Sequence, residues 1–119
     1  MRIKMTSIHV TDPAPAFSFY TEVLGFQELV AMPELSLLIV QSADTGDGAG
    51  LLREPGDSPI GAAYRQGVYD AGTAAIVFGT PDVQAEYQRL TDARVRFTGP
   101  PAPDHSGTLA AVFDEASAT

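Results

Sequence analysis

Residues 7–26 read SIHVTDPAPAFSFYTEVLGF and carry the strongest structural signals in the chain. Up to the Asp-Pro pair, apolar and other side chains alternate with a period of two, which is typical of a strand with one buried face. Ile8 and Val10 would lie on the buried face. The opposite face would carry Met5, Ser7 and His9. We therefore expect a strand over residues 3–11.

A helix is expected directly after this strand. The side chain of Asp12 can accept a hydrogen bond from a free amide of the first helical turn, and Pro13 lacks an N–H that would be unpaired there. One apolar stripe then follows at spacings of three and four, and its members are Phe17, Tyr20 and Leu24. Gly25 is the expected C-terminal cap.

Three short apolar runs come next, at residues 26–32, 35–40 and 49–52. Turn-forming residues separate them, so the simplest interpretation is a three-stranded antiparallel meander. Residues 56–72 contain many Pro and Gly residues and are interpreted as a connector, with a short helix at 62–69.

The opening pattern returns after the connector, which indicates an internal repeat. An apolar strand is predicted at residues 73–79, followed by a second helix with its own apolar stripe, a strand at 94–98 and a strand at 108–113. An offset of 70 aligns Asp12 with Asp82. We predict a single domain over residues 1–119, made of a first module at about 1–55, the connector, and a second module at about 73–119. Two units too small to bury their own apolar faces can pack together.

The composition limits the kinds of partner. The chain has 119 residues and a net charge of −8, because seven Lys and Arg stand against fifteen Asp and Glu. The basic residues are scattered, so we expect neither a nucleic acid partner nor a membrane surface. Cysteine is absent, which excludes disulfides and thiolate metal sites. The first residues contain no long apolar run, and we expect a cytoplasmic protein.

Residues 7–26 resemble the opening of the vicinal oxygen chelate superfamily, which includes glyoxalases, bleomycin resistance proteins and extradiol dioxygenases. The likeness rests on the pattern D-x-x-x-A-x-x-F-Y-x-x-V-L-G-F and extends to residues 82–90, 95–97 and 111–114. It implies an α+β fold in which two tandem βαβββ modules form a curved mixed sheet, with helices outside and a ligand on the concave side. The second module would lack its last strand, because the chain reads DEASAT after Phe113.

The same resemblance implies where a metal ion would be held in related enzymes. The positions of the first ligand in each module correspond to Met5 and Ala75, whose thioether and methyl groups are poor ligands for Mg, Mn, Fe or Zn. A further family position falls at Arg53 or Glu54, and one carboxylate does not make a metal site. We therefore predict no metal and no cofactor.

Other side chains could contact a ligand in the concave face. His9 could donate or accept a hydrogen bond or act as a general base, or it could be a space-filling histidine bonded to a carbonyl group. Tyr64 and Tyr69 could cover the ligand, or they could cover the core edge or an oligomer contact. The strand at 35–40 makes the lining largely apolar whichever face it presents, and such a cavity suits a partly apolar small molecule. The candidate lining residues are Met5, Ser7, His9, Glu54, Tyr64, Tyr69 and Ala75.

Three functions remain open at this stage. The first is a metal-free protein that binds a small, partly apolar molecule, in the manner of bleomycin resistance proteins, as a homodimer. The second is a metal-dependent lyase, isomerase or dioxygenase that uses His9 and Glu54 in a shifted site or a site completed by a partner chain. The third is an interaction module that acts through its dimer surface. Catalytic residues are not assigned, and whether the protein is an enzyme stays undecided.

Overall fold

The computed structural model describes residues 1–35, 37–44, 48–55 and 58–114, with only the backbone described at 52–55. These residues form two compact units, Met1–Ile76 and Val77–Thr119. We describe each unit by itself.

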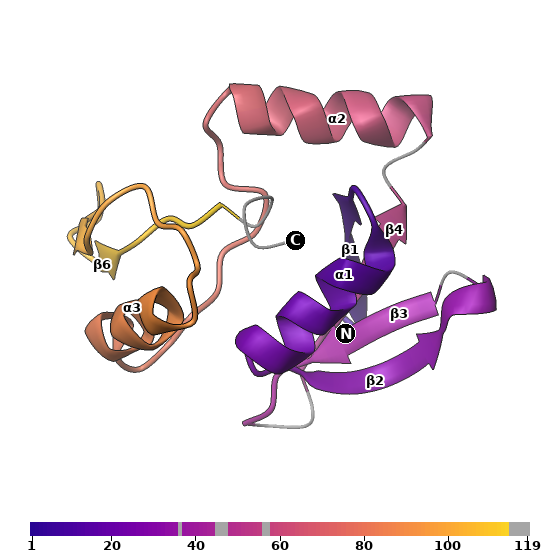
Figure 1. Cartoon of the computed structure of the whole chain (residues 1–119), viewed down its shortest axis with the longest axis horizontal. Coiled ribbons are helices and arrows are strands. Elements are labelled where there is room, and N and C mark those ends of the chain that lie inside the picture. The colour runs from indigo at the N-terminus through magenta and orange to yellow at the C-terminus, as the bar shows by residue number, and fades with distance from the viewer. Residues whose placement is uncertain (36, 45–47, 56–57, 115–119) are drawn as a thin grey trace. The chain divides into compact units, whose positions relative to one another are not determined.

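A four-stranded mixed sheet forms the centre of the first unit (Figure 1). Its strands are β1 (Met5–Val10), β2 (Gln27–Met32), β3 (Leu37–Gln41) and β4 (Gly50–Pro55). Their order across the sheet is β1-β4-β3-β2. Strands β2, β3 and β4 pair antiparallel, so the predicted meander is confirmed, and β1 pairs parallel with β4.

The helix after β1 begins where the sequence predicts. Helix α1 spans Pro13–Ser18, and the Asp12 carboxylate accepts a hydrogen bond of 3.2 Å from the Ala14 amide. The chain then widens into one π turn, η1 (Phe19–Val23), which the apolar spacing did not predict. The Thr21 hydroxyl donates to the Phe17 carbonyl at 2.9 Å within this segment. Gly25 follows with a φ of 88°, a conformation that glycine adopts without steric cost.

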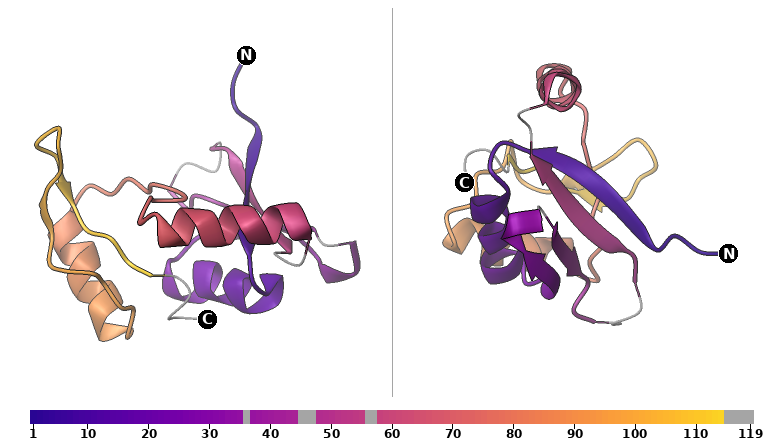
Figure 2. Two further views of the ribbon diagram at one scale, coloured as in Figure 1. Left: turned by 90° about the horizontal axis from the view of Figure 1, so that it is seen from above. Right: turned by 90° about the vertical axis from the view of Figure 1, so that its right-hand side faces the viewer.

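The core of the first unit lies between one face of the sheet and this helical segment (Figure 2). Val40 is fully buried and Tyr20 is 1% exposed. The other buried apolar side chains of this core are Val10, Ala16, Phe19, Leu38 and Leu51. Alternation along β3 therefore directs Leu38 and Val40 towards α1 and leaves Leu37 and Ile39 for the opposite face.

The predicted short helix at residues 62–69 is confirmed, and it is longer than expected. Helix α2 spans Pro59–Asp70, because the Ser58 hydroxyl accepts a hydrogen bond from the Gly61 amide at 3.0 Å and Pro59 occupies the first helical position. Gly72, with a φ of 67°, follows its end. Helix α2 contacts β1 and lies beyond the carboxyl ends of β1 and β4 (Figures 1 and 2).

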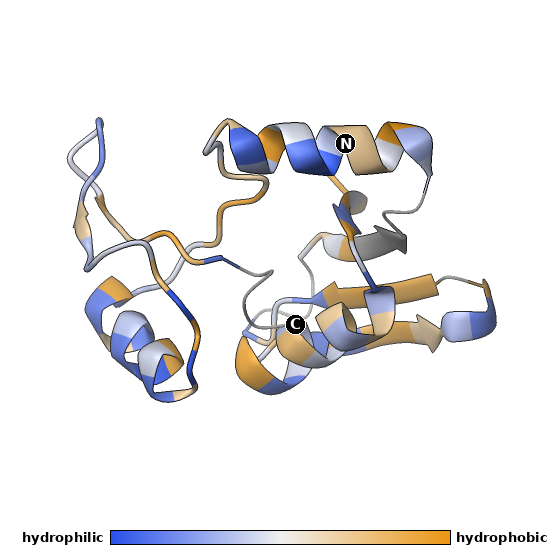
Figure 3. Ribbon diagram, turned by 45° about the horizontal axis from the view of Figure 1, so that its top comes forward, coloured by the Kyte–Doolittle hydropathy of each residue, from blue (hydrophilic) through white to orange (hydrophobic). Residues whose placement is uncertain are grey.

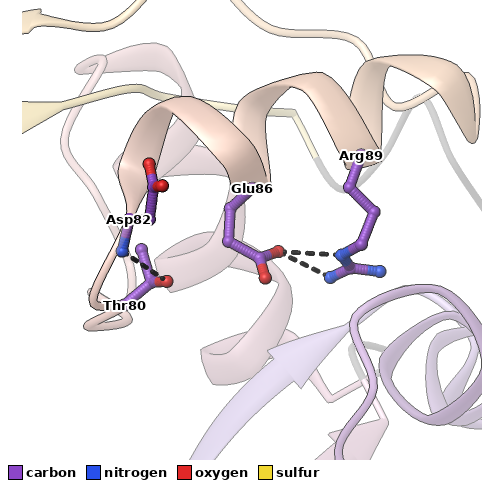
Figure 4. A network of polar contacts seen from close by, with 4 residues as sticks. All are labelled: Thr80, Asp82, Glu86 and Arg89. Atoms are coloured by element: carbon purple, nitrogen blue, oxygen red, sulfur yellow. Dashed lines mark hydrogen bonds and ion pairs between the residues drawn. The ribbon is translucent and has the colours of Figure 1, made fainter.

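The second unit contains α3 (Val83–Asp92) and a short hairpin of β5 (Ala102–Pro103) and β6 (Leu109–Ala110). The Asp82 carboxylate caps α3 by accepting from the Ala85 amide at 3.0 Å, which repeats the role of Asp12. Figure 4 shows the Thr80 hydroxyl accepting from the Asp82 amide, and the ion pair between Glu86 and Arg89. Leu90 and Val95 are buried, and four aromatic rings of this unit pack against one another. These rings are Phe78, Tyr87, Phe97 and Phe113.

The α+β class with a curved mixed sheet is confirmed, but the strands predicted in the second half are wrong in extent. Among the described residues, 73–79 form no strand. The strand predicted at 94–98 is reduced to one bridge between Phe97 and Phe113, and the strand predicted at 108–113 is reduced to β6 and that bridge. Apolar alternation predicts a side-chain pattern, whereas a strand also needs a neighbour that accepts its backbone hydrogen bonds.

Candidate functional site

The pairing of the strands places three predicted site residues on one face. Met5 pairs with Gly50, Ser7 with Leu52 and His9 with Glu54 across β1 and β4. Because paired residues share a face, this face lies opposite the one that packs on α1. We call it the His9 face, and it comprises Met5, Ser7, His9, Val30, Met32, Leu37, Ile39, Gln41 and Gly50.

The His9 face is partly open to solvent and changes character across the sheet. Met5 is 51% exposed and Met32 is 46% exposed, so described residues do not cover its two margins. The β2 and β3 side is apolar, as the orange colour along these strands shows in Figure 3, whereas the β1 side carries a hydroxyl and an imidazole. Ile39 lies over Gly50, where a Cβ atom would be 3.0 Å from its Cγ2.

Helix α2 rests directly on the imidazole of His9. A Cβ atom at Gly61 would lie 2.8 Å from His9 Nδ1, so only glycine fits at this contact without a shift. The ring of Tyr64 meets the ring of His9 edge to face, with centroids 6.2 Å apart. Two residues that the sequence predicted separately, on a strand and in the connector, are therefore neighbours.

The remaining predicted site residues lie apart from this contact or are only partly described. Tyr69 is 60% exposed and lies five positions after Tyr64 on α2, which turns it to another side of the helix. Ala75 is exposed and lies outside the strands. The backbone of Glu54 is the register partner of His9, and its side chain lies outside the described part of the structure.

Sequence reasoning missed the contribution of the first turn of α2. The Pro and Gly content of residues 56–72 indicates a connector, whereas the run Ser58-Pro59-Ile60-Gly61 is a helix start with a capping hydroxyl. The glycine at the third helical position is what permits the close approach to His9. That pairing depends on the tertiary fold, so the run alone could predict the helix but not its neighbour.

No group of three His, Asp or Glu side chains placed to hold a metal ion occurs among the residues that the structure describes. His105 lies in an exposed loop beside Asp104. The hydrogen bond from the Ser106 side chain at 2.6 Å, together with backbone amides of the same loop, lowers the pKa of Asp104 below its ordinary value of 3.8.

Within the described residues, no helix has the length and apolar character needed to cross a membrane.

Comparison with known families identifies the class of protein that this fold and face define. The chain matches the model of the Glyoxalase/Bleomycin resistance protein/Dioxygenase superfamily over residues 2–117, and it belongs to this superfamily. It is 40% identical over 117 residues to the Uncharacterized protein YurT of Bacillus subtilis (strain 168), a match that covers 97% of this chain and 91% of YurT.

Solved structures show the same fold. UcmS2 superimposes with a TM-score of 0.75 at 26% identity, covering 97% of this chain and 92% of UcmS2. A superfamily member from Sphaerobacter thermophilus DSM 20745 gives a TM-score of 0.69 at 22% identity, covering 95% and 87% of the two chains. TnmS3, an antibiotic binding protein from Streptomyces sp. CB03234, gives 0.60 at 23% identity, covering 88% and 78%. The resemblance inferred from residues 7–26 is therefore confirmed.

Proposed function

We propose that this protein binds a small, partly apolar molecule on the His9 face without the help of a metal ion. The observation that carries the proposal is the unequal use of the two sheet faces. One face is sealed by α1, with Val40 fully buried. The other face buries Ile39 at its centre but exposes Met5 on β1 and Met32 on β2 at its two margins. An apolar surface with a few polar groups at one side is the usual character of a small-molecule site.

The chemistry of the family's metal positions supports a metal-free site. The resemblance assigns the first ligand of each module to Met5 and Ala75. A thioether is a soft ligand and a methyl group is none, so neither replaces the imidazole or carboxylate oxygens that catalytic divalent ions require. The fold also serves binding elsewhere, since TnmS3 is described as an antibiotic binding protein; that likeness concerns the fold alone.

Two neighbours on β1 offer a matched test of the site. Met5 lies on the His9 face, and Thr6, the next residue, points to the other face of the sheet. With the neutral fluorescent probe 2-naphthamide, we expect saturable binding to the unaltered protein, a loss of roughly tenfold or more in affinity for Met5→Lys, and little change for Thr6→Lys. Equal losses in both variants, or no saturable binding, would contradict the proposal.

The absence of a metal requirement is tested separately. Calorimetric titration with Mn²⁺, Fe²⁺, Ni²⁺ and Zn²⁺ should show no tight stoichiometric binding. Tight binding of one ion per chain would favour the enzymatic alternative instead.

A homodimer is proposed as the working form. In the described residues β1 stands at one edge of the sheet, and an edge strand is the kind of element that pairs with another chain. Sedimentation equilibrium should give twice the chain mass. A monomer at micromolar concentration would overturn this part of the proposal and leave ligand binding untouched.

One observation favours a second function. His9 and Glu54 are register partners on adjacent strands, and an imidazole and a carboxylate are two of the ligands that a metal-dependent lyase, isomerase or dioxygenase would need. In this alternative a partner chain supplies the third ligand. If His9→Ala alters neither metal content nor turnover of glyoxal–thiol adducts or catechols, this alternative fails.

A further inference from the structure

The side of α2 that faces β1 carries a positive charge. Gly61 points to His9, and Arg65 follows four residues later, about 6 Å along the helix axis and on nearly the same side. Burial agrees with this arrangement, because Gly61 is buried and Arg65 is half-buried, whereas Ile60 is 84% exposed. Arg65 therefore lies on the inner side of the helix.

The guanidinium of Arg65 has no partner among the described residues. Its Nε atom is buried, and no hydrogen bond or ion pair to its guanidinium is found in the part of the chain that the structure describes. The nearest acidic residue that follows on α2, Asp70, accepts a hydrogen bond from Gln66 at 2.8 Å. A guanidinium is always charged and carries only donors, and a buried donor left unpaired is unfavourable. Such a group is suited to an acceptor that comes from outside the chain.

Two further polar groups lie at the contact between α2 and β1. Tyr64, the preceding residue, meets His9 edge to face, and its hydroxyl makes no hydrogen bond to any described residue. A phenol and an imidazole can each donate a hydrogen bond, so three groups that can act as donors gather where α2 meets the end of β1. The apolar part of the His9 face begins on the neighbouring strands.

We infer that His9, Tyr64 and Arg65 form a subsite for the acidic group of the ligand, which makes the ligand class an organic carboxylate with an apolar body. This inference rests on the proposed function and adds the charge of the ligand to it. The planar guanidinium matches a carboxylate with two parallel hydrogen bonds. The overall charge of −8 opposes an anion only weakly at the site, because charges further than about 8–10 Å away are screened at physiological salt.

The test uses two probes that share one ring system and differ in charge, 2-naphthoate and 2-naphthamide. We expect the protein to bind the naphthoate roughly tenfold or more tightly than the amide, as measured by fluorescence titration, since a charge-assisted pair is worth about that factor. Arg65→Met keeps the aliphatic stem and should abolish the preference, and Tyr64→Phe should reduce it. Arg89→Met is the control, because Arg89 pairs with Glu86 on α3, and its preference should be unchanged.

The outcomes distinguish a failure of the acidic subsite from a failure of the proposed function. Equal binding of both probes, or an unchanged preference in Arg65→Met, would overturn the acidic subsite and leave the proposed function standing. Binding of neither probe would overturn both. Thermal unfolding monitored by circular dichroism reports whether each variant is folded. If Arg65→Met does not fold, Arg65→Lys is used instead, because lysine keeps the positive charge but lacks the two parallel N–H donors of the guanidinium. A full naphthoate preference in this variant would contradict bidentate recognition.

Discussion

Gly61 shows how one missing side chain sets the position of a helix. The space above its Cα is occupied by His9 Nδ1 and by the Ser58 hydroxyl, at 2.8 and 2.9 Å from the position a Cβ atom would take. Distances this short force a neighbour to move. Both neighbours are held, the imidazole by the strand and the hydroxyl by its cap on the helix.

We therefore predict that Gly61→Ala destabilises the protein by about 1–3 kcal/mol, the usual cost of overpacking. Gly67→Ala is the matched control, because Gly67 lies in the same helix with nothing within 4 Å of the added atom. Alanine is the better helix former, so that variant should be more stable by about 0.5–1 kcal/mol. Urea unfolding measures both changes. Shifts of the same sign would contradict the contact between α2 and His9.

Asp104 gives a prediction about proton binding. The Ser106 hydroxyl donates to its carboxylate at 2.6 Å and is the largest cause of its lowered pKa. Because the folded pKa lies below 3.8, the stabilising effect is complete above that pH and is lost as the pH falls through the folded pKa. Ser106→Ala should raise the pKa of Asp104 towards 3.8, as followed by carboxyl NMR titration. His105→Ala removes none of the hydrogen bonds to Asp104 and serves as the control; an equal rise there would contradict the assignment.

At the scale of elements, the core of the first unit forms where β3 and β4 pack on the helical segment. Val40 is fully buried there. We predict that Val40→Ala lowers the free energy of unfolding by roughly 2 kcal/mol, the transfer and cavity terms together. Val77→Ala removes the same atoms from a side chain that is 85% exposed and should change stability by less than about 0.5 kcal/mol. Equal losses, measured by urea unfolding, would show that the core is misassigned.

Local signals predicted the elements whose causes are local. Asp12 and Asp82 each cap a helix, because a carboxylate and the free amides of a first turn lie within a few residues of each other. The π turn in η1 and the missing strand at 73–79 could not be predicted this way. The π turn depends on which backbone carbonyl accepts the hydrogen bond of each amide. The strand depends on a pairing partner that is distant in sequence.

The candidate site was predictable only in part for the same reason. Alternation along residues 3–11 placed Met5, Ser7 and His9 on a common face, and the strand register agrees. The contact of His9 with Tyr64 joins residues 55 positions apart, and nothing in the sequence links them. The sequence does not single out Arg65 as a site residue, because a lone arginine in a polar segment usually faces solvent. Only its position relative to β1 makes it a candidate ligand-binding residue.

At the scale of the molecule, the two compact units differ in how their backbones are protected. The first contains the four-stranded sheet with a fully buried strand residue, whereas the second contains one helix, a hairpin of two short strands and isolated hydrogen bonds. The hairpin residues are exposed on both strands. Local opening costs the least free energy where hydrogen bonds are few and solvent-accessible.

Hydrogen exchange should therefore divide the chain at the boundary between Ile76 and Val77. We expect the central amides of β3 and β4 to be protected roughly a hundredfold or more relative to the amides of Thr98 and Asp104, a difference of about 2.8 kcal/mol in opening free energy. The latter two donate to Val112 and Thr108 in the second unit, both at 2.8 Å. Native-state exchange followed by NMR gives these values residue by residue. Uniform protection in both units would instead mean that the whole chain opens as one cooperative structure. The second module would then depend on the first for its stability.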